Sequence, residues 1–228
     1  MATIAERLIE AHKRIANAAA LNHRPMNSIT LMAVSKTKPA AMVQEAYAAG
    51  ARHFGENYLQ EGIEKIQHLP ELTEATWHFI GPIQSNKSRP IAEHFDWVHT
   101  LDRFKIAQRL NEQRPAHSPP LNVCIQVNIS QEMSKSGVAP EQLLPLAEAI
   151  SALPQLRLRG LMAIPAATED LHQQRASFAA LRQLFDTLQS HYPSLDTLSM
   201  GMSDDMEAAI AEGSTMVRIG SAIFGSRI

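Results

Sequence analysis

The sequence has only one cysteine, Cys124, among 228 residues. A single cysteine excludes an internal disulfide and a zinc site built on several thiolates, and it suits a reducing compartment. An excess of one charge is also missing, because 21 Lys and Arg residues balance 23 Asp and Glu residues to a net charge of −2. Such a balance gives no electrostatic footprint for nucleic acid or for an anionic membrane, and we expect neither as a partner.

Long apolar runs are absent too. Charged residues from Glu6 to Arg14 interrupt the first segment, so no signal peptide is expected. No apolar run is long enough to span a bilayer, and we therefore predict a cytoplasmic protein. The ten histidines are scattered without an HExxH or comparable ligand spacing, which favours solvated or packed histidines over a metal site.

What is present is the composition of a globular protein with a sizeable core, at 45% hydrophobic and 19% charged residues. No linker, repeat or low-complexity segment divides the chain, so we expect one domain over residues 1–228. Nothing in the sequence demands a dimer, and a monomer is expected.

Strand-like and helix-like segments alternate along the chain. Apolar residues recur at helical spacing over the first twenty residues, which predicts a helix ahead of the first strand. Strands are expected at 29–36, 52–57, 77–82, 96–101, 121–129, 156–164, 196–200 and 215–219, and helices at 40–49, 58–68, 85–95, 102–113, 140–152, 169–191 and 204–211. Eight such repeats in one domain favour an α/β fold, a single (β/α)₈ TIM barrel with an extra N-terminal helix. A doubly wound open sheet is the alternative.

The first strand ends in a lysine, Lys36. Its residues are apolar on both faces, as in a parallel strand that is covered on both sides, and Pro39 prevents its continuation. Lys36 lies on the same face as Met32 and Val34. It is either a solvated charge at the strand end or an amine in an apolar pocket, ready to form a Schiff base, and this stretch alone leaves both open.

Two later strands place polar side chains inside the predicted barrel. In the fifth strand, alternation directs Cys124, Gln126 and Asn128 inward, which indicates either a polar ligand-binding end or an internal hydrogen-bonded network. In the eighth, Arg218 points inward near the carboxyl end. A buried guanidinium must find an acceptor, either a carboxylate such as Glu207 or a ligand atom, and its position favours the ligand.

Glycine-containing turns follow the seventh and eighth strands. The first leads to Ser203, which could cap the next helix, and the second contains Gly220 and Ser221. The loops after these two strands of a TIM barrel are a frequent phosphate site. Asp204 and Asp205 flank the proposed site and would repel phosphate unless they face solvent.

A lysine and a phosphate site at the end of a barrel are compatible with two functions. One is a site for pyridoxal 5'-phosphate, and the other is a class I Schiff-base aldolase that acts on a sugar phosphate. Arg218 favours the cofactor, because a guanidinium can donate to a pyridine nitrogen. The aldolase would want a lysine in a later strand, but residues 156–163 contain none.

Six motifs spread over the chain resemble the pyridoxal phosphate homeostasis proteins of the YggS type. They are AVSKTKP at 33–39, FGENY at 54–58, WHFIG at 77–81, QSNK at 84–87, LSMGMSDDM at 198–206 and VRIG at 217–220. The resemblance implies a fold-type III barrel like the N-terminal domain of alanine racemase. It implies further that the protein binds the cofactor but has no established reaction. It also implies that Lys36 forms the Schiff base, that Ser203, Gly220 and Ser221 hold the phosphate, that Asn57 lies near the ring and that Arg218 faces the pyridine nitrogen.

The implied function is intracellular buffering or delivery of pyridoxal 5'-phosphate, with effects on amino-acid and keto-acid balance. Cofactor-dependent apoenzymes are the expected recipients. An amino-acid racemase or lyase that uses the same cofactor is the competing function. The sequence leaves the roles of Lys38 and Lys135 open.

Overall fold

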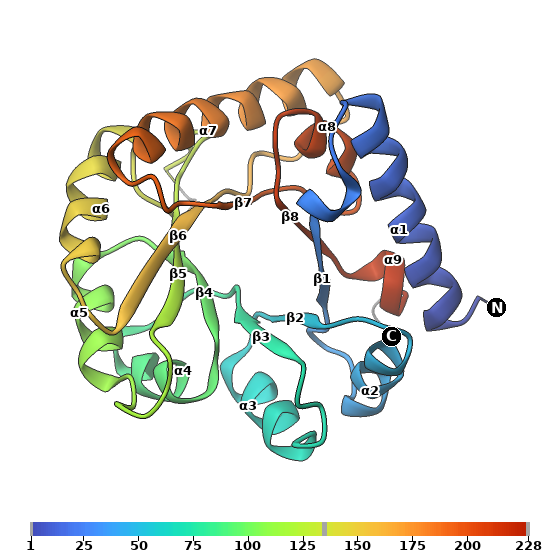
Figure 1. Cartoon of the computed structure of the whole chain (residues 1–228), viewed down its shortest axis with the longest axis horizontal. Coiled ribbons are helices and arrows are strands. Elements are labelled where there is room, and N and C mark those ends of the chain that lie inside the picture. Colours follow the sequence, from blue (N-terminus) through green and yellow to red (C-terminus); the bar gives the residue numbers. More distant parts are fainter. Residues whose placement is uncertain (1, 134–135, 227–228) are drawn as a thin grey trace.

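Eight parallel strands close into one barrel in the computed structural model, which describes residues 2–133 and 136–226 (Figure 1). Each strand pairs with its neighbour in sequence, and β1 pairs with β8 to close the ring. The strands are β1 (Thr30–Val34), β2 (His53–Glu56), β3 (Thr76–Phe79), β4 (Trp97–Leu101), β5 (Leu121–Gln126), β6 (Leu156–Met162), β7 (Thr197–Ser199) and β8 (Met216–Ile219). The predicted TIM barrel is confirmed, and the open sheet is wrong.

Helices surround the barrel and cover its outer face, as Figure 1 shows. They are α1 (Ile4–Leu21), α2 (Ala40–Ala48), α3 (Leu59–His68), α4 (Ser88–His94), α5 (Phe104–Gln113), α6 (Leu143–Ser151), α7 (Leu171–His191), α8 (Met206–Ala211) and α9 (Ser221–Phe224). The outward-facing strand residues and the inner helix faces form the main apolar core. This core buries the outward face of the strands.

The predicted N-terminal helix is present as α1. Thr3 and Glu6 form a capping box at its start, which satisfies two backbone donors that would otherwise lack partners. Its apolar face packs against α8 and α9, so the first helix lies beside the last two (Figure 1). Arg14 donates to Glu207 at 2.8 Å and to the Ser203 carbonyl at 2.9 Å, which ties α1 to the loop after β7.

Two apolar clusters occupy the barrel interior. Met32, Val34, Ile80 and Met216 form one, and Trp97, Cys124 and Met162 form the other. The predicted inward orientation of Cys124 is therefore confirmed. Between these clusters the interior is polar, and this polar band leads to the site described below.

Several local predictions need correction. The helix expected at 85–95 is a 3-10 turn (Ser85–Lys87) followed by α4, because Pro90 fits only within the first turn of an α-helix. The helix expected at 204–211 begins at Met206 with Asp205 as its N-cap. The Asp205 carboxylate accepts from the Met202 backbone N–H at 2.7 Å, so Ser203 does not cap this helix.

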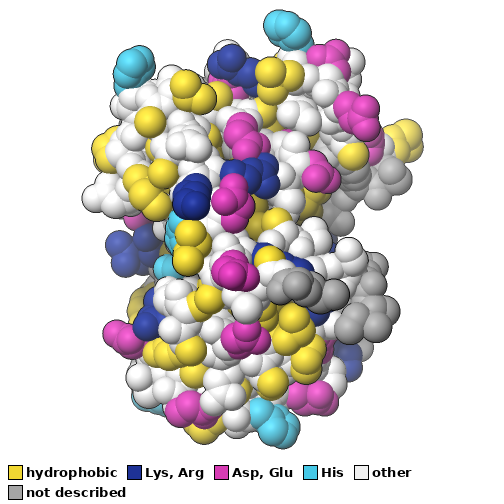
Figure 2. Space-filling view, turned by 90° about the vertical axis from the view of Figure 1, so that its right-hand side faces the viewer, with side chains coloured by type: hydrophobic (Ala, Val, Ile, Leu, Met, Phe, Trp, Pro, Cys, Tyr) yellow, Lys and Arg dark blue, Asp and Glu magenta, His cyan; other side chains and the backbone are white. Residues whose placement is uncertain are grey.

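Charges of both signs are interspersed over the face that Figure 2 shows, without a large field of one sign. This mixture agrees with the balanced composition. Within residues 2–133 and 136–226, no helix combines the length and the apolar character needed to cross a membrane.

Candidate functional site

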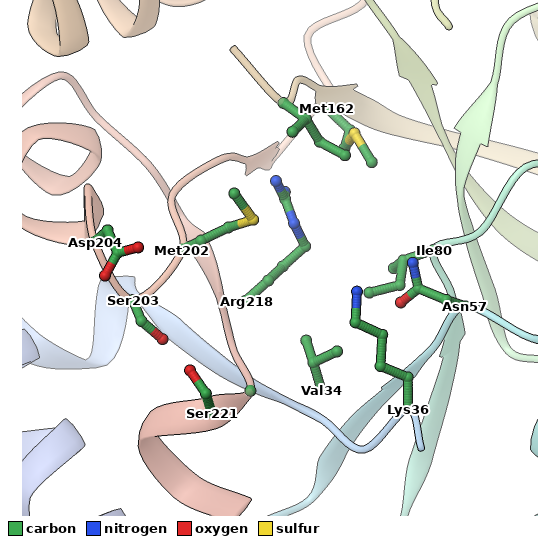
Figure 3. A pocket seen from close by; sticks show the side chains of 12 residues that line it. Val34, Lys36, Asn57, Ile80, Met162, Met202, Ser203, Asp204, Arg218 and Ser221 are labelled. Carbon is green, nitrogen blue, oxygen red and sulfur yellow. The ribbon is translucent and has the colours of Figure 1, made fainter. Parts of the chain in front are cut away.

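A pocket of about 260 Å³ opens at the carboxyl ends of the strands (Figure 3). TIM barrels carry their active sites at this end. All six residues that the sequence predicted for a cofactor site line it: Lys36, Asn57, Ser203, Arg218, Gly220 and Ser221. Its apolar wall consists of Val34, Ile80, Met162, Ile164 and Met202.

Lys36 enters the pocket from the turn that follows β1. The strand ends at Val34, two residues earlier than predicted, although the Ser35 N–H still donates to the Gly55 carbonyl at 3.0 Å. The Lys36 side chain extends into the pocket beside Val34 (Figure 3). Thr37 adopts a left-handed backbone with φ of +62°, which is rare for a β-branched residue and typical of a turn held in place by its surroundings.

A buried ion pair supports this turn from below. Lys65 donates to Glu56 at 2.7 Å and to the Ser35 carbonyl at 2.6 Å, and the Ser35 hydroxyl donates to the same carboxylate oxygen of Glu56. Burial raises the pKa of Glu56, against the lowering effect of Lys65 and Ser35. Ser35 directly precedes Lys36, and Glu56 directly precedes Asn57. The hydrogen bonds among Ser35, Glu56 and Lys65 therefore fix the backbone next to both pocket residues.

Asn57 presents an acceptor to the pocket. Its Oδ1 is buried and has no hydrogen-bond partner within the part of the chain that the structure describes. The backbone of Asn57 is held closely, because a Cβ added at Gly81 would lie 2.0 Å from the Asn57 carbonyl oxygen. A ligand with a donor at this point would therefore meet a fixed and unsatisfied acceptor.

Ser203 and Ser221 lie on the opposite side of the pocket from Lys36. Their hydroxyls point toward one another (Figure 3). Asp204 also lines the pocket and is exposed to solvent. The loop that carries Ser203 passes through Gly201, whose φ of +99° and close contact with Ala209 require glycine. Two hydroxyls and the backbone near Gly220 form a donor-rich corner that suits an anion such as phosphate.

Arg218 lies at the floor of the pocket and is 4% exposed. Its Nη1 donates to the Ser199 hydroxyl at 2.8 Å, and its Nη2 donates to the Ala163 carbonyl at 3.0 Å. Burial lowers the pKa of Arg218 to about 10, so it remains a cation at neutral pH. Glu207, the carboxylate that the sequence offered as the alternative acceptor, pairs with Arg14 instead.

Three histidines that the sequence analysis left aside continue this network through the barrel. His99 Nδ1 lies 2.9 Å from the Ser199 hydroxyl, His99 Nε2 lies 2.9 Å from His78 Nδ1, and His78 Nε2 lies 2.9 Å from His53 Nδ1. The signal was present, because each histidine occupies an inward position of β2, β3 or β4. They are not a metal centre, since no group of acidic, histidine or cysteine side chains in the described segments could hold an ion.

The predicted row of amides does not reach the pocket. Gln126 ends β5 and Asn128 lies beyond it, and neither lines the cavity. Asn128 donates instead to the Glu132 carbonyl at 2.8 Å. Lys38 is buried and donates to the Ser226 carbonyl at 2.7 Å, whereas Lys135 lies outside the described residues.

Comparison with known proteins places these residues in a family context. The model of the alanine racemase N-terminal domain matches residues 10–228. A pyridoxal phosphate homeostasis protein of Pseudomonas aeruginosa is 63% identical over 227 residues, which cover 100% of this chain and 97% of that protein.

Solved structures extend the comparison to the fold. PipY of Synechococcus elongatus with pyridoxal phosphate bound is 41% identical with a TM-score of 0.83, covering 98% of this chain and 100% of that one. Alanine racemase of Corynebacterium glutamicum has a TM-score of 0.67 at 18% identity, covering 92% of this chain and 59% of that one. At that identity the likeness concerns the barrel alone.

Proposed function

The chain belongs to the family of pyridoxal phosphate homeostasis proteins, and on that premise we propose that it binds pyridoxal 5'-phosphate reversibly through Lys36. The observation that carries the proposal is the convergence of all six predicted residues on one pocket. Arg218 lies on β8, and the other five come from the segments after β1, β2, β7 and β8, so that only the barrel brings them together.

The donors and acceptors of the pocket fit this cofactor. Ser203, Ser221 and the backbone near Gly220 suit its phosphate, because hydroxyl and N–H donors can surround an anion. The buried Oδ1 of Asn57 suits a polar substituent near the ring. Arg218 retains N–H donors beyond the two that it uses, and one of these can donate to the ring nitrogen.

Lys36 supplies the covalent attachment. Its Nζ amine would hold the cofactor by condensing with its aldehyde with loss of one water, and hydrolysis would return both partners unchanged. The cofactor, when bound, supplies an electron-withdrawing ring. Arg218 would donate a hydrogen bond to the ring nitrogen without transferring its proton, so that this nitrogen would stay unprotonated.

Buffering or delivery of the cofactor is the role that we propose, with consequences for amino-acid and keto-acid balance. The pocket suits this role because it opens to solvent and its attachment is reversible. The recipients are apoenzymes that depend on the cofactor, and the chain acts in the cytoplasm as a monomer and a single domain over residues 1–228. A racemase or lyase would need a further proton donor. Among the described lining residues, the ionisable side chains are those of Lys36, Asp204 and Arg218.

The test is the absorbance spectrum of the purified protein before and after reduction with borohydride. We expect a band in the near-visible region that borohydride bleaches, with the reduced cofactor fixed on the peptide that contains Lys36. In Lys36→Ala the band disappears, but weak non-covalent binding remains because the phosphate corner is intact.

Lys38→Arg is the matched control, because Lys38 is the nearest lysine in sequence and its Nζ bonds to Ser226. This variant should keep the band. Mass spectrometry that finds the reduced cofactor on Lys38 would refute the assignment, as would a normal band in Lys36→Ala.

A further inference from the structure

A continuous chain of hydrogen bonds crosses the barrel interior from the pocket to its opposite end. It begins at Arg218 on β8, passes through Ser199 on β7 and His99 on β4, and continues through His78 on β3 to His53, the first residue of β2. The step from Ser199 to His99 joins strands that are not neighbours in the sheet. The chain therefore depends on the closed barrel.

The direction of every hydrogen bond in this chain follows from one count of donors and acceptors. Arg218 can only donate, so Ser199 accepts from it. The hydrogen of the Ser199 hydroxyl then needs an acceptor, and His99 Nδ1 is the other hydrogen-bond partner of this oxygen within the part of the chain that the structure describes. A buried donor left without an acceptor would destabilise the fold, because it loses its hydrogen bond to water and gains none in return. His99 Nδ1 therefore carries no proton.

The same reasoning determines which nitrogen carries the proton in His99 and in His78. A neutral His99 without a proton on Nδ1 carries it on Nε2 and donates to His78 Nδ1. His78 is then protonated on Nε2 and donates to His53 Nδ1. All the bonds run in one direction, away from Arg218 and toward the half-buried His53.

The surroundings keep the inner rings neutral. Burial, together with the charge of Arg218, lowers the pKa of His99 to about 3. Burial also lowers the pKa of His78 well below its usual value, with His99, His53 and Arg159 adding to the effect. The Trp97 ring stacks on both His78 and His99, with ring centroids 5.3 Å and 5.6 Å apart.

We propose that Ser199 and His99 are positioning residues for Arg218, and that His99 and His78 hold one fixed tautomer, protonated on Nε2. The His99 acceptor locks the rotation of the Ser199 hydroxyl, so that a lone pair always faces Arg218. This fixes the guanidinium and leaves its remaining donors aimed at the pocket. The consequence for the cofactor's ring nitrogen rests on the function proposed above.

Nitrogen-15 NMR of histidine-labelled full-length protein tests the tautomers directly. We expect His78 and His99 to show a bare Nδ1 and a protonated Nε2 between about pH 5 and pH 8, where an ordinary histidine changes charge. The pattern should be the same with cofactor bound and after its removal. Ser199→Ala should release His99 from this single tautomer. A proton on His99 Nδ1 in the parent protein, or a charged His99 in this range, overturns the proposal.

Cofactor binding tests the positioning role. His99→Leu removes the acceptor and should raise the dissociation constant by up to about tenfold, the effect of one neutral hydrogen bond, and should shift the absorbance maximum. His99→Asn keeps an acceptor near the position of Nδ1 and should restore values close to the parent's. His191→Asn, on the exposed end of α7, is the control.

Equal affinities and spectra in His99→Leu and the parent would overturn the positioning role. If His99→Leu does not fold, Ser199→Ala provides the same comparison with a smaller change in volume. If instead the proposed cofactor binding is wrong, the parent protein lacks the absorbance band while its histidine tautomers stay as described. The two failures are therefore distinguishable.

Discussion

Replacing Lys65 with methionine tests how much the buried Lys65–Glu56 ion pair beside the pocket contributes to stability. The Lys65 side chain is 5% exposed and that of Glu56 is fully buried. Their contact measures 2.7 Å, and Lys65 Nζ also bonds to the Ser35 carbonyl and to Glu61. Removing one partner of a buried ion pair leaves an uncompensated charge, so we expect Lys65→Met to lower the free energy of unfolding by about 3–5 kcal/mol at neutral pH.

The pH dependence gives this prediction a sign. Burial raises the pKa of Glu56, while Lys65 lowers it. Between the pKa of Glu56 in the unfolded chain and its higher pKa in the folded chain, the folded chain binds more protons, and stability falls as pH rises through that range. Lys65→Met removes the lowering effect of Lys65, so the folded pKa of Glu56 rises and the range extends to higher pH. The loss should be largest near neutral pH and should shrink as pH falls below the folded pKa of Glu56.

Urea denaturation followed by circular dichroism, at neutral and at mildly acidic pH, measures the effect. Glu56→Gln combined with Lys65→Met removes both charges and should recover much of the lost stability. Arg89→Met is the control, because its pair with Glu93 is exposed and 3.9 Å long, and it should change stability by less than about 0.5 kcal/mol. Cofactor retention should also weaken in Lys65→Met, since Ser35 leads directly into Lys36.

The reasoning fails if Lys65→Met unfolds at the parent's urea concentration at neutral pH. It also fails if the loss is the same at both pH values, because the destabilisation would then not come from a stranded Glu56 carboxylate.

Three further predictions concern the pocket itself. Ser203→Ala and Ser221→Ala should each weaken cofactor retention by on the order of 1 kcal/mol, and an unchanged dissociation constant in the double variant would place the phosphate elsewhere. Gly81→Ala brings a Cβ to 2.0 Å from the Asn57 carbonyl oxygen, so the melting temperature and cofactor affinity should both fall; parental values for both would contradict this. The protein should show no substantial racemase turnover, because racemisation needs a proton donor on each face and Lys36 serves only one. Single amino-acid enantiomers incubated in deuterated water test this, and inversion at about 1 s⁻¹ or faster would make the protein a racemase.

Much of the site could be predicted from the sequence because it depends on local order. Strands that are apolar on both faces and alternate with helices indicate a parallel barrel, and its carboxyl end gathers whatever follows each strand. Lys36 and Ser221 each follow a strand closely, so their convergence needed no knowledge of side-chain packing, whereas Asn57 was predicted from the family resemblance alone.

The partners of Arg218 could not be predicted in the same way. Ser199 and Ala163 become its acceptors through the register of three strands, which the sequence does not state. The link from His99 to Ser199 spans the barrel between strands that are far apart in the sheet. Only the order and tilt of the closed barrel bring those atoms within hydrogen-bond distance.

The closing pair of strands has a mechanical consequence. Thr30–Ala33 on β1 pair with Met216–Ile219 on β8, and the pocket straddles that joint, with Lys36 on one side and Ser221 on the other. A ligand that contacts both sides links the first and the last strand of the barrel. Closing a loop of that length costs the most entropy, so a bound ligand opposes separation of β1 from β8. Separation of these two strands would in turn release the ligand.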